Sequence, residues 1–264
     1  GGVDTITTLT GYDIVLGGDD GDSITVSDLG NLVTDDHNIV IGDDGRIVYD
    51  TDDDASDIDL IESTSTTAAG GSDTINTGYG DDIVIGGRFG DTIAARDGDN
   101  VVIGDSGRIS ADTDGTYRHL AGHALTFGTI ETFAYGDGGV DTITTLTGYD
   151  IVLGGHEGDV ITVSDLTNLV TDDHNIVIGD DGRIVYDNDG DASDIDLIES
   201  TSTLYAGGAD TIDTGDGDDI VIGGRFGDVI NARNGDNIVT GDSGRITAGV
   251  ALAGLAGHPM EIDK

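Results

Sequence analysis

Apolar β-branched residues recur along the chain at intervals of nine. Residues 77–85 read Thr-Gly-Tyr-Gly-Asp-Asp-Ile-Val-Ile and residues 86–94 read Gly-Gly-Arg-Phe-Gly-Asp-Thr-Ile-Ala, so the sixth position is Asp and the eighth is Ile or Val. Helix and strand side chains repeat about every 3.6 and 2 residues, and neither period gives nine. A glycine-containing turn of about six residues followed by a strand of about three does. The pattern therefore predicts short strands joined by tight turns.

Sixteen nonapeptides share this frame, and two of them complete a coil of 18 residues that stacks on the next coil at about 4.8 Å. The eighth position should point into the coil, and it is β-branched in every nonapeptide: Ile6, Val15, Ile24, Val40, Ile75, Val84, Ile93, Val102, Ile143, Val152, Ile161, Val177, Ile212, Val221, Ile230 and Val239.

A longer repeat contains the nonapeptides. Residues 1–68 align without gaps to 138–205 with eight differences. We divide the chain into tandem units 1–137 (halves 1–69 and 70–137) and 138–264 (halves 138–206 and 207–264), with insertions at roughly 26–32 and 163–169. Tandem repeats of this length are typical of arrays in which each unit supports its neighbours. Because the repeat begins at residue 1, we expect the chain to be part of a longer protein.

Positions seven and nine predict two unlike outer faces. One sheet carries mainly polar pairs such as Thr5/Thr7, and the other carries apolar pairs such as Ile83/Ile85 and Ile220/Ile222. Strands that are apolar on both faces are normally buried on both faces. The apolar sheet must therefore be covered, either by other segments of this chain (those around Ile61, Ile130 and Ile198, and residues 110–137) or by lateral association with another chain. We favour internal cover because those segments recur along the repeat.

The charge of the chain limits its partners. It has 53 acidic residues against 10 Lys and Arg, a formal net charge of −43, and no Cys. This charge argues against nucleic acid and anionic lipid as partners, and no apolar run is long enough to insert into a membrane. Such a charge is typical of disorder, so the regular apolar pattern predicts a fold in which cations neutralise the carboxylates.

The frame resembles the glycine-rich nonapeptide of the RTX (repeats-in-toxin) family, Gly-Gly-x-Gly-x-Asp-x-apolar-x, most closely at residues 78–84 and 215–221. The resemblance covers a little over half of the chain. It implies an all-β fold, a right-handed parallel β-roll or β-solenoid with irregular insertions, whose turns bind Ca²⁺. Two departures occur in each half, since the third nonapeptide has Gly at position five and the fourth has Asn in place of Asp. At those turns we expect weaker binding or the end of the array.

The sixth position supplies the candidate metal ligands. It recurs directly above itself every 18 residues, as in Asp73 and Asp91. Carboxylates stacked about 5 Å apart repel unless a cation lies between them, and Ca²⁺ accepts six to eight oxygen ligands, including main-chain carbonyls. The alternative is a solvated acidic solenoid whose Asp residues only favour turns. The predicted ligands are Asp4, Asp13, Asp22, Asn38, Asp73, Asp82, Asp91, Asn100, Asp141, Asp150, Asp159, Asn175, Asp210, Asp219, Asp228 and Asn237.

Two further motifs lie outside the nonapeptides. The spacing Asp50-x-Asp52-x-Asp54, repeated at 187–191, resembles the start of an EF-hand loop but lacks its Gly and its final Glu. An accessory Ca²⁺ loop and a plain acidic hairpin tip are both consistent with it. Gly-Asp-x-Gly-Arg-Ile closes each half, and we expect its arginines to fix the acidic turn by pairing with carboxylates: Arg46, Arg108, Arg183 and Arg245.

The sequence favours a structural function over an enzymatic one. It has no nucleophile or phosphate-loop motif, and the His119/His123 pair is better explained as part of a covering segment than as a zinc site. We predict a calcium-binding structural segment of a long secreted or cell-surface protein, such as a fibre, stalk, adhesin or matrix element. The alternative is a calcium-binding accessory module of a secreted enzyme or toxin whose active domain lies elsewhere.

Overall fold

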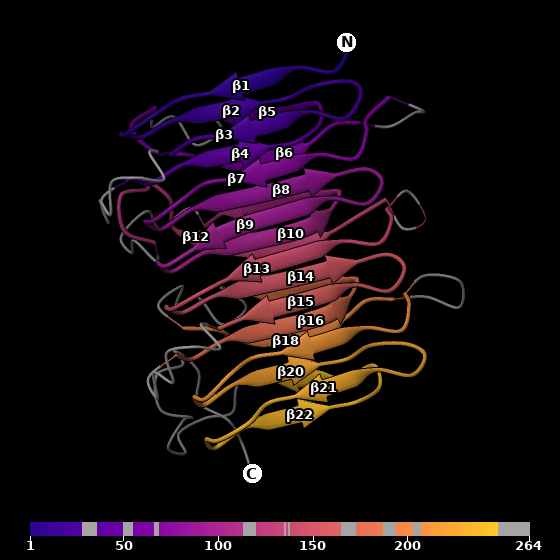
Figure 1. The fold of residues 1–264 in the computed structure, drawn as a ribbon. Helices are drawn as coiled ribbons and strands as arrows, with labels where there is room; N and C mark the ends of the chain where they lie inside the picture. Colours follow the sequence, from indigo (N-terminus) through magenta and orange to yellow (C-terminus); the bar gives the residue numbers. More distant parts are fainter. Residues whose placement is uncertain are drawn as a thin grey trace.

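The fold is an elongated stack of short strands (Figure 1). A computed structural model describes residues 1–27, 36–49, 55–65, 69–112, 120–134, 136, 138–164, 173–186, 194–202 and 207–247. These residues form 23 strands and no helix, and therefore contain no helix that could cross a membrane. The predicted all-β class is confirmed, and the parallel stack agrees with a β-solenoid.

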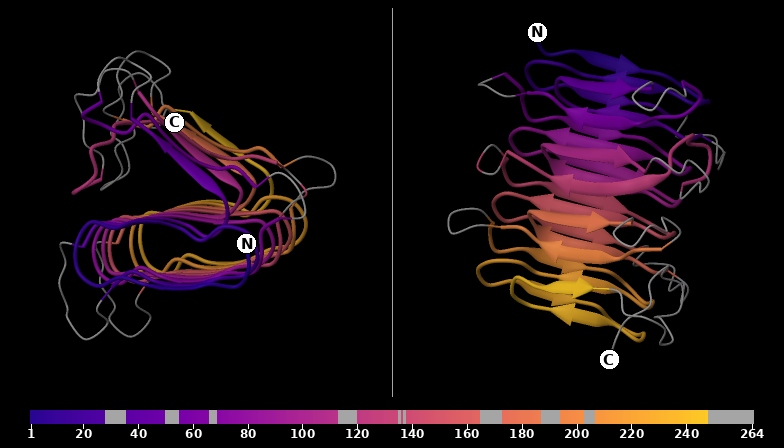
Figure 2. Two further views of the ribbon diagram at one scale, coloured as in Figure 1. Left: turned by 90° about the horizontal axis from the view of Figure 1, so that it is seen from above. Right: turned by 180° about the vertical axis from the view of Figure 1, so that it is seen from behind.

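Two parallel sheets of eight strands form the roll, and their strands alternate along the chain. Seen along the stack, they make a flattened closed loop (Figure 2). Sheet A contains β1 (Thr5–Thr7), β3 (Ser23–Thr25), β7 (Thr74–Asn76), β9 (Thr92–Arg96), β13 (Thr142–Thr145), β15 (Val160–Val163), β19 (Thr211–Asp213) and β21 (Val229–Asn231). Sheet B contains β2 (Ile14–Leu16), β4 (Ile39–Ile41), β8 (Ile83–Gly87), β10 (Val101–Asp105), β14 (Ile151–Gly155), β16 (Ile176–Asp180), β20 (Ile220–Ile222) and β22 (Ile238–Thr240).

The register aligns equivalent positions of successive nonapeptides. Val84 of β8 lies beside Val102 of β10, and Val102 lies beside Val152 of β14. The second of these pairs joins the first tandem unit to the second, as does the pairing of β9 with β13. The two units therefore form one continuous stack without a break in either sheet.

The inner layer fills the roll between sheets A and B. It consists almost entirely of the predicted eighth-position residues, which are buried except at the two ends of the stack. Ile6 and Ile230, in the first and last strands of sheet A, are only partly buried against it. One inward β-branched side chain per strand is enough to fill the roll because the sheets are narrow and every rung repeats the same shape.

A third sheet, antiparallel, covers the outer face of sheet B. Sheet C lies obliquely along one long side of the roll (Figure 2). It contains β5 (Gly45–Val48), β6 (Leu60–Ser63), β11 (Gly107–Ala111), β12 (Phe127–Thr132), β17 (Gly182–Val185), β18 (Leu197–Ser200) and β23 (Arg245–Thr247). Each half of a repeat leaves the roll to contribute to this sheet. The predicted internal cover of sheet B is thus confirmed.

The outer layer fills the space between sheets B and C. Ile83, Ile85 and Ile220 of sheet B are fully buried against Ile61 and Ile130 of sheet C. Further large side chains complete the layer: Ile58, Leu120, Leu125, Phe127, Tyr186 and Ile195. At roughly 1.5–3 kcal/mol for each fully buried aliphatic side chain, this layer is a major part of the folding energy. No described strand covers the outer face of sheet A, and Val160 and Val229 there are exposed.

The arginines of the Gly-Arg-Ile motif do not fix the acidic turn, so that prediction is wrong. The isoleucine that follows each arginine points into the outer layer, so the arginine itself points outward from sheet C. Each arginine pairs with a glutamate of a neighbouring strand. Arg46 Nε lies 2.6 Å from Glu62 Oε1, and Arg108 bonds Glu131. Cross-strand neighbours alternate in charge along the whole sheet: Arg46, Glu62, Arg108, Glu131, Arg183, Glu199 and Arg245.

Candidate metal sites on two edges of the roll

The structure places the sixteen predicted ligands in two columns, one on each edge of the roll. We name the columns by their composition. The Asp edge precedes the strands of sheet A and consists of Asp4, Asp22, Asp73, Asp91, Asp141, Asp159, Asp210 and Asp228. The Asn edge precedes the strands of sheet B and consists of Asp13, Asn38, Asp82, Asn100, Asp150, Asn175, Asp219 and Asn237.

On the Asp edge, one oxygen of each carboxylate from Asp22 to Asp228 accepts a hydrogen bond that links two neighbouring rungs. The backbone N–H of Asp22 donates to Asp73 Oδ1 at 2.6 Å, and that of Asp91 donates to Asp141 Oδ1 at 2.7 Å. The same bond joins every neighbouring pair from Asp4 to Asp228. Position six therefore requires a side-chain oxygen that accepts the amide of the preceding rung, which Asp supplies on this edge and Asn supplies in alternate rungs of the other.

The second oxygen of these carboxylates has no hydrogen-bond donor. The Oδ2 atoms concerned are buried: those of Asp22, Asp73, Asp91, Asp141, Asp159, Asp210 and Asp228. Buried polar atoms are nearly always paired, and a buried carboxylate oxygen without a donor or cation costs several kcal/mol. The column thus lacks one positively charged or proton-donating partner per rung.

Glycine carbonyls lie beside the unpaired oxygens. A Cβ atom on Gly86 would come within 2.3 Å of Asp91 Oδ2 and 2.1 Å of the Gly104 carbonyl oxygen. A Cβ atom on Gly104 would come within 2.2 Å of Asp141 Oδ2 in the same way. Any larger residue would push its side chain into these oxygens. The glycines therefore allow a carboxylate oxygen and a main-chain carbonyl oxygen to approach the same point of the turn.

A third group of aspartates lies on the Asp edge, and sequence reasoning missed it. Asp43, Asp105 and Asp180 are the residues at which the chain leaves the roll for sheet C, and all three are buried. Asp43 accepts N–H bonds from Gly71 at 3.0 Å and Arg88 at 2.6 Å, one on each oxygen. The sequence feature that indicates this group is the second residue of Gly-Asp-x-Gly-Arg-Ile, which is Asp in every half.

Burial raises the pKa values of the six Asp-edge carboxyls from Asp73 to Asp228. Desolvation raises the pKa of Asp73 to about 7 and that of Asp141 to about 8. It raises the pKa of Asp91 well above the ordinary value, and the charges of Asp141, Asp73 and Asp43 add to this. Asp105 behaves likewise, with the charge of Asp141 second to burial. The pKa values show that the charged form of this edge is unfavourable without a counter-ion.

On the Asn edge, side-chain amides donate to neighbouring carboxylates. The Asn100 side-chain amide donates to Asp150 Oδ1 at 2.9 Å and to the Gly98 carbonyl at 2.9 Å. Asn38 and Asn175 make the equivalent amide bonds to Asp82 and Asp219.

Threonine hydroxyls reach the second oxygen at two rungs of this edge. Thr145 Oγ1 lies 2.6 Å from Asp150 Oδ2, and Thr214 Oγ1 lies 2.6 Å from Asp219 Oδ2. Only Asp13 and Asp82 keep an Oδ2 atom without a donor among the described residues of this column. Burial still raises the pKa of Asp150 to about 8, although the bonds from Thr145 and Asn100 act in the opposite direction.

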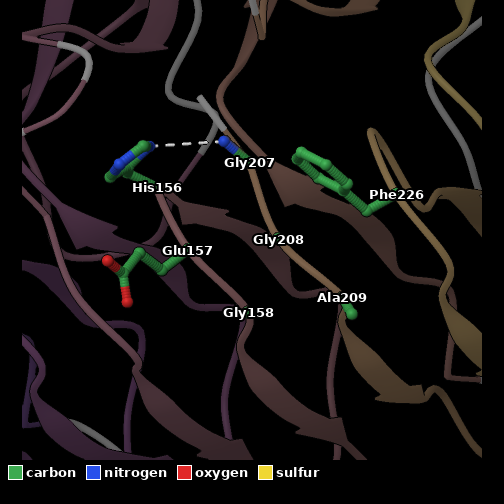
Figure 3. A pocket seen from close by; sticks show the side chains of 7 residues that line it. All are labelled: His156, Glu157, Gly158, Gly207, Gly208, Ala209 and Phe226. Carbon is green, nitrogen blue, oxygen red and sulfur yellow. Dashed lines mark hydrogen bonds between the residues drawn. The ribbon is translucent and has the colours of Figure 1, made fainter. Parts of the chain in front are cut away.

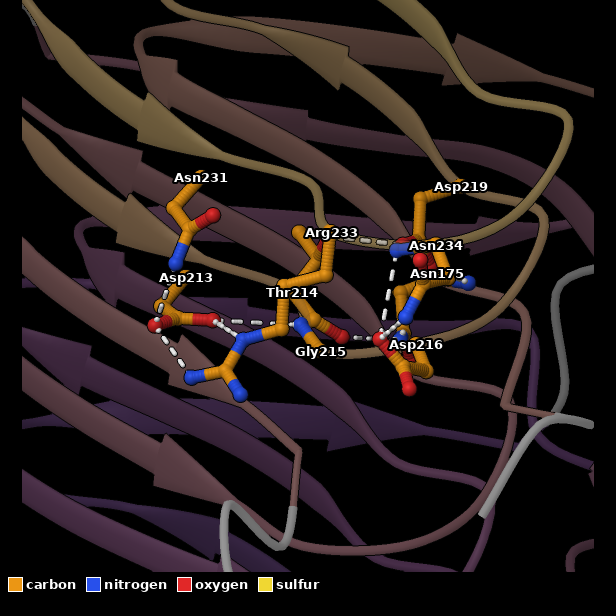
Figure 4. A network of polar contacts seen from close by, with 9 residues as sticks. All are labelled: Asn175, Asp213, Thr214, Gly215, Asp216, Asp219, Asn231, Arg233 and Asn234. Carbon is orange, nitrogen blue, oxygen red and sulfur yellow. Dashed lines mark hydrogen bonds and ion pairs between the residues drawn. The ribbon is translucent and has the colours of Figure 1, made fainter. Parts of the chain in front are cut away.

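Further polar contacts surround the Asn edge in the last coils (Figure 4). Arg233 bonds Asp213 with both Nε and Nη2 at 2.9 Å. Burial of Asp213 acts to raise its pKa, but these bonds and the Arg233 charge outweigh it and lower the pKa. Asn234 donates to Asp216 Oδ1 through its side chain at 2.9 Å. Acidic residues near this edge therefore have protein partners.

Within the described part of the chain, no three His, Asp or Glu side chains converge as a metal-binding group. A cation on either edge would therefore need main-chain carbonyls as well as carboxylates. This donor set suits Ca²⁺, which accepts mixed carboxylate and carbonyl oxygens in flexible geometry.

Of the remaining candidate sites, the structure describes His123 alone. The acidic motifs at 50–54 and 187–191 and His119 lie outside the described residues. His123 is buried, with Nε2 2.7 Å from the Asp81 carbonyl oxygen and its ring 5.4 Å from that of Tyr12. Burial lowers the pKa of His123 to about 4. This histidine packs as part of the segment covering sheet B.

A shallow hollow lies over the turns of the second unit (Figure 3). Its lining includes His156, Glu157 and Phe226 beside the glycines at 207–208. His156 Nδ1 accepts an N–H bond from Gly207 at 3.3 Å, so its ring is held by the turn. The residues that line the hollow include no Ser, Thr, Cys or Lys nucleophile beside His156 and Glu157.

Comparison with known proteins adds no assignment, since no family model, curated protein or solved structure matches the chain.

Proposed function

We propose that this chain is a calcium-binding structural repeat segment of a long extracellular protein, one that folds when it binds Ca²⁺. The observation that carries the proposal is the column of buried Asp Oδ2 atoms without donors on the Asp edge, beside glycine carbonyls. Oxygen atoms arranged in this way fit the ligand preference of Ca²⁺ at about 2.3–2.6 Å. Mg²⁺ fits less well because it requires strict octahedral geometry and retains water.

The residues that would hold the ion are carboxylates and carbonyls of successive turns. Asp91 and Asp141, with the carbonyl of Gly104 between them, illustrate the set. A bound Ca²⁺ supplies positive charge that the chain itself lacks, since only 10 basic residues oppose 53 acidic ones. The proposed roll is right-handed with coils of 18 residues, in keeping with the resemblance to RTX repeats.

A structural element is favoured over an accessory module by the continuity of the stack. Sheets A, B and C all run through both tandem units, and β12 of the first unit pairs with β17 of the second. Such a stack is extended by adding units, as a fibre, stalk, adhesin or matrix element requires. We propose that the segment lies outside the cell, where calcium-binding modules bind Ca²⁺ at about 10⁻⁴–10⁻³ M.

Circular dichroism during a calcium titration tests the proposal. In EDTA at neutral pH we expect an expanded chain with little β structure, because unneutralised carboxylates repel. In millimolar calcium we expect a β-rich rod, and Mg²⁺ at the same concentration should not replace it. Isothermal titration calorimetry measures the number of bound ions. A β spectrum that is the same in EDTA and calcium, with no ion bound, contradicts the proposal.

A further inference from the structure

We infer that Ca²⁺ binds along the Asp edge alone, and that the asparagines make the opposite edge independent of calcium. This inference rests on the proposed function and divides the sixteen predicted ligands into two sets of unlike role. Sequence reasoning treated both columns as one kind of site with weaker turns. The structure separates them by what each carboxylate oxygen already touches.

The first step is the supply of hydrogen-bond donors. On the Asp edge each carboxylate from Asp22 to Asp228 receives a backbone N–H on Oδ1 and nothing on Oδ2. On the Asn edge, a side-chain amide is inserted between successive carboxylates and donates to Oδ1 as well: Asn100 to Asp150 at 2.9 Å, and Asn175 to Asp219 at 3.1 Å. The asparagine amide thus donates to the carboxylate oxygen, a role that a cation would otherwise fill.

The second step is charge density. At position six the Asp edge places a carboxylate in every rung, at spacings of about 5 Å, whereas the Asn edge places one in every second rung, about 10 Å apart. Further buried aspartates of the Asn-edge turns, Asp36, Asp173 and Asp216, accept backbone N–H bonds from neighbouring rungs. Doubling the separation halves the direct repulsion between neighbours. The buried Asp43, Asp105 and Asp180 lie beside the Asp edge and increase its negative charge further.

The third step concerns the atoms that the glycines of each edge face. Glycines of the Asp edge, such as Gly86 and Gly104, face both a carboxylate oxygen and the carbonyl of the next rung. Glycines of the Asn edge face main-chain atoms or serine side chains and no carboxylate oxygen. A Cβ atom on Gly98 would meet the Gly80 carbonyl oxygen, and one on Gly78 would meet Ser27 Oγ. The Asn-edge turns therefore stack directly on one another without a carboxylate directed into the gap.

Matched Asp→Asn substitutions on the two edges test the inference. Asp91→Asn and Asp141→Asn remove a charge from the Asp edge, and Asp150→Asn and Asp219→Asn remove one from the Asn edge, at carboxylates whose two oxygens both have donors. All four side chains are buried and keep their size. Calorimetry and equilibrium dialysis with calcium alone measure bound ions per chain, and circular dichroism shows the folded fraction at saturating calcium.

We expect each Asp-edge variant to lose about one bound ion and to need several-fold more calcium to fold. The Asn-edge variants should bind as many ions as the original chain. Equal losses of bound ions on both edges overturn the inference but leave the proposed calcium-binding function standing. A chain that binds no calcium before any substitution overturns the proposed function instead, so the two failures are distinguishable.

A gain-of-charge variant keeps the test decisive if an Asp→Asn variant does not fold. Asn100→Asp places three successive carboxylates at positions 82, 100 and 150 of the Asn edge. The amide donor to Asp150 is then lost and the charge density equals that of the Asp edge. We expect one additional bound ion, or a higher calcium concentration at the folding midpoint. An unchanged ion count together with an unchanged midpoint contradicts the inference.

Discussion

Two hydrophobic layers lie on opposite sides of sheet B, and they are built in different ways. The inner layer, inside the roll, takes one β-branched residue from each strand and repeats it with little change along the stack. The outer layer, between sheets B and C, takes two residues from most strands of sheet B and meets them with leucine, phenylalanine and tyrosine as well as isoleucine. The inner layer is a periodic column, and the outer layer is an ordinary mixed core.

The difference shows where the stability of a narrow roll comes from. A single column of Ile and Val buries little apolar surface per residue, and the carboxylates at both edges oppose its folding. The outer layer adds large, fully buried side chains with few ionisable groups among them. We conclude that the inner layer depends on the state of the edges, whereas the outer layer depends on the packing of sheet C.

The largest expected difference between the layers is their response to pH without calcium. Burial raises the pKa of Asp141, Asp82 and Asp150 to about 8, and that of Asp73 to about 7. A carboxyl with a raised pKa in the folded state stabilises that state fully below its unfolded value, near 4, and this contribution is lost as pH rises through 7 and 8. The calcium-free roll should therefore be more folded at pH 5 than at pH 9.

The buried His123 acts in the opposite direction within the covering segment. Its pKa is lowered to about 4, so the stability it contributes is present above its ordinary value of 6.5 and decreases as pH falls toward 4. Circular dichroism in EDTA at pH 5 and 9 measures the overall effect, and amide hydrogen exchange separates the strands of sheet A from those of sheet C. More β structure at pH 9 than at pH 5 contradicts the assignment of unfavourable charges to the edges.

The next effect concerns the outer layer alone. Ile83→Lys or Ile220→Lys inserts a charge between sheets B and C, where both isoleucines are fully buried. We expect each substitution to lower the free energy of unfolding by about 4 kcal/mol or more, because a buried unpaired charge adds to the lost packing. Urea denaturation in saturating calcium measures this change.

Thr74→Lys, on the exposed face of sheet A, is the matched control. Thr74 is exposed, so the substitution should change the free energy of unfolding by less than about 0.5 kcal/mol. Mass measurement in solution adds a second reading, since internal cover predicts that the isoleucine variants lose stability without any change from monomer. A stable Ile83→Lys variant that instead loses assembly contradicts internal cover as the reason for burial.

The two layers also differ in how far the sequence predicts them. The nine-residue period of Val84 and its equivalents indicates both the inner layer and the stacking of position six, because each depends on contacts between identical positions. The apolar pairs such as Ile83/Ile85 predict that sheet B is covered. They do not predict which side chains cover it, since Phe127 and Tyr186 occur in segments without a period.

The candidate site follows the same division. Sequence spacing predicts both columns of position-six residues. It does not indicate that Asn100 donates to Asp150, or that the Asp105 oxygens are taken by amides of Gly139 and His156, because these depend on side-chain orientation in three dimensions. The role predicted for Arg108 is wrong for a related reason, since its partner Glu131 lies 23 residues away on a strand with no nonapeptide frame.

The smallest expected effect concerns the outer side of sheet C, where the Arg–Glu ladder lies. Arg108 pairs with Glu131 and also neighbours Glu62, but 44% of its side-chain surface remains exposed. Solvent screens such a pair, so Arg108→Ala should cost about 1 kcal/mol or less in free energy of unfolding, and less still in high salt. A double-mutant cycle with Glu131→Ala, measured by urea denaturation, isolates the pair. Replacing the isoleucine at position 109, one residue away but buried in the outer layer, with alanine should cost about 2–5 kcal/mol. If Arg108→Ala costs as much as Ile109→Ala, then the ladder rather than the outer layer holds sheet C on the roll.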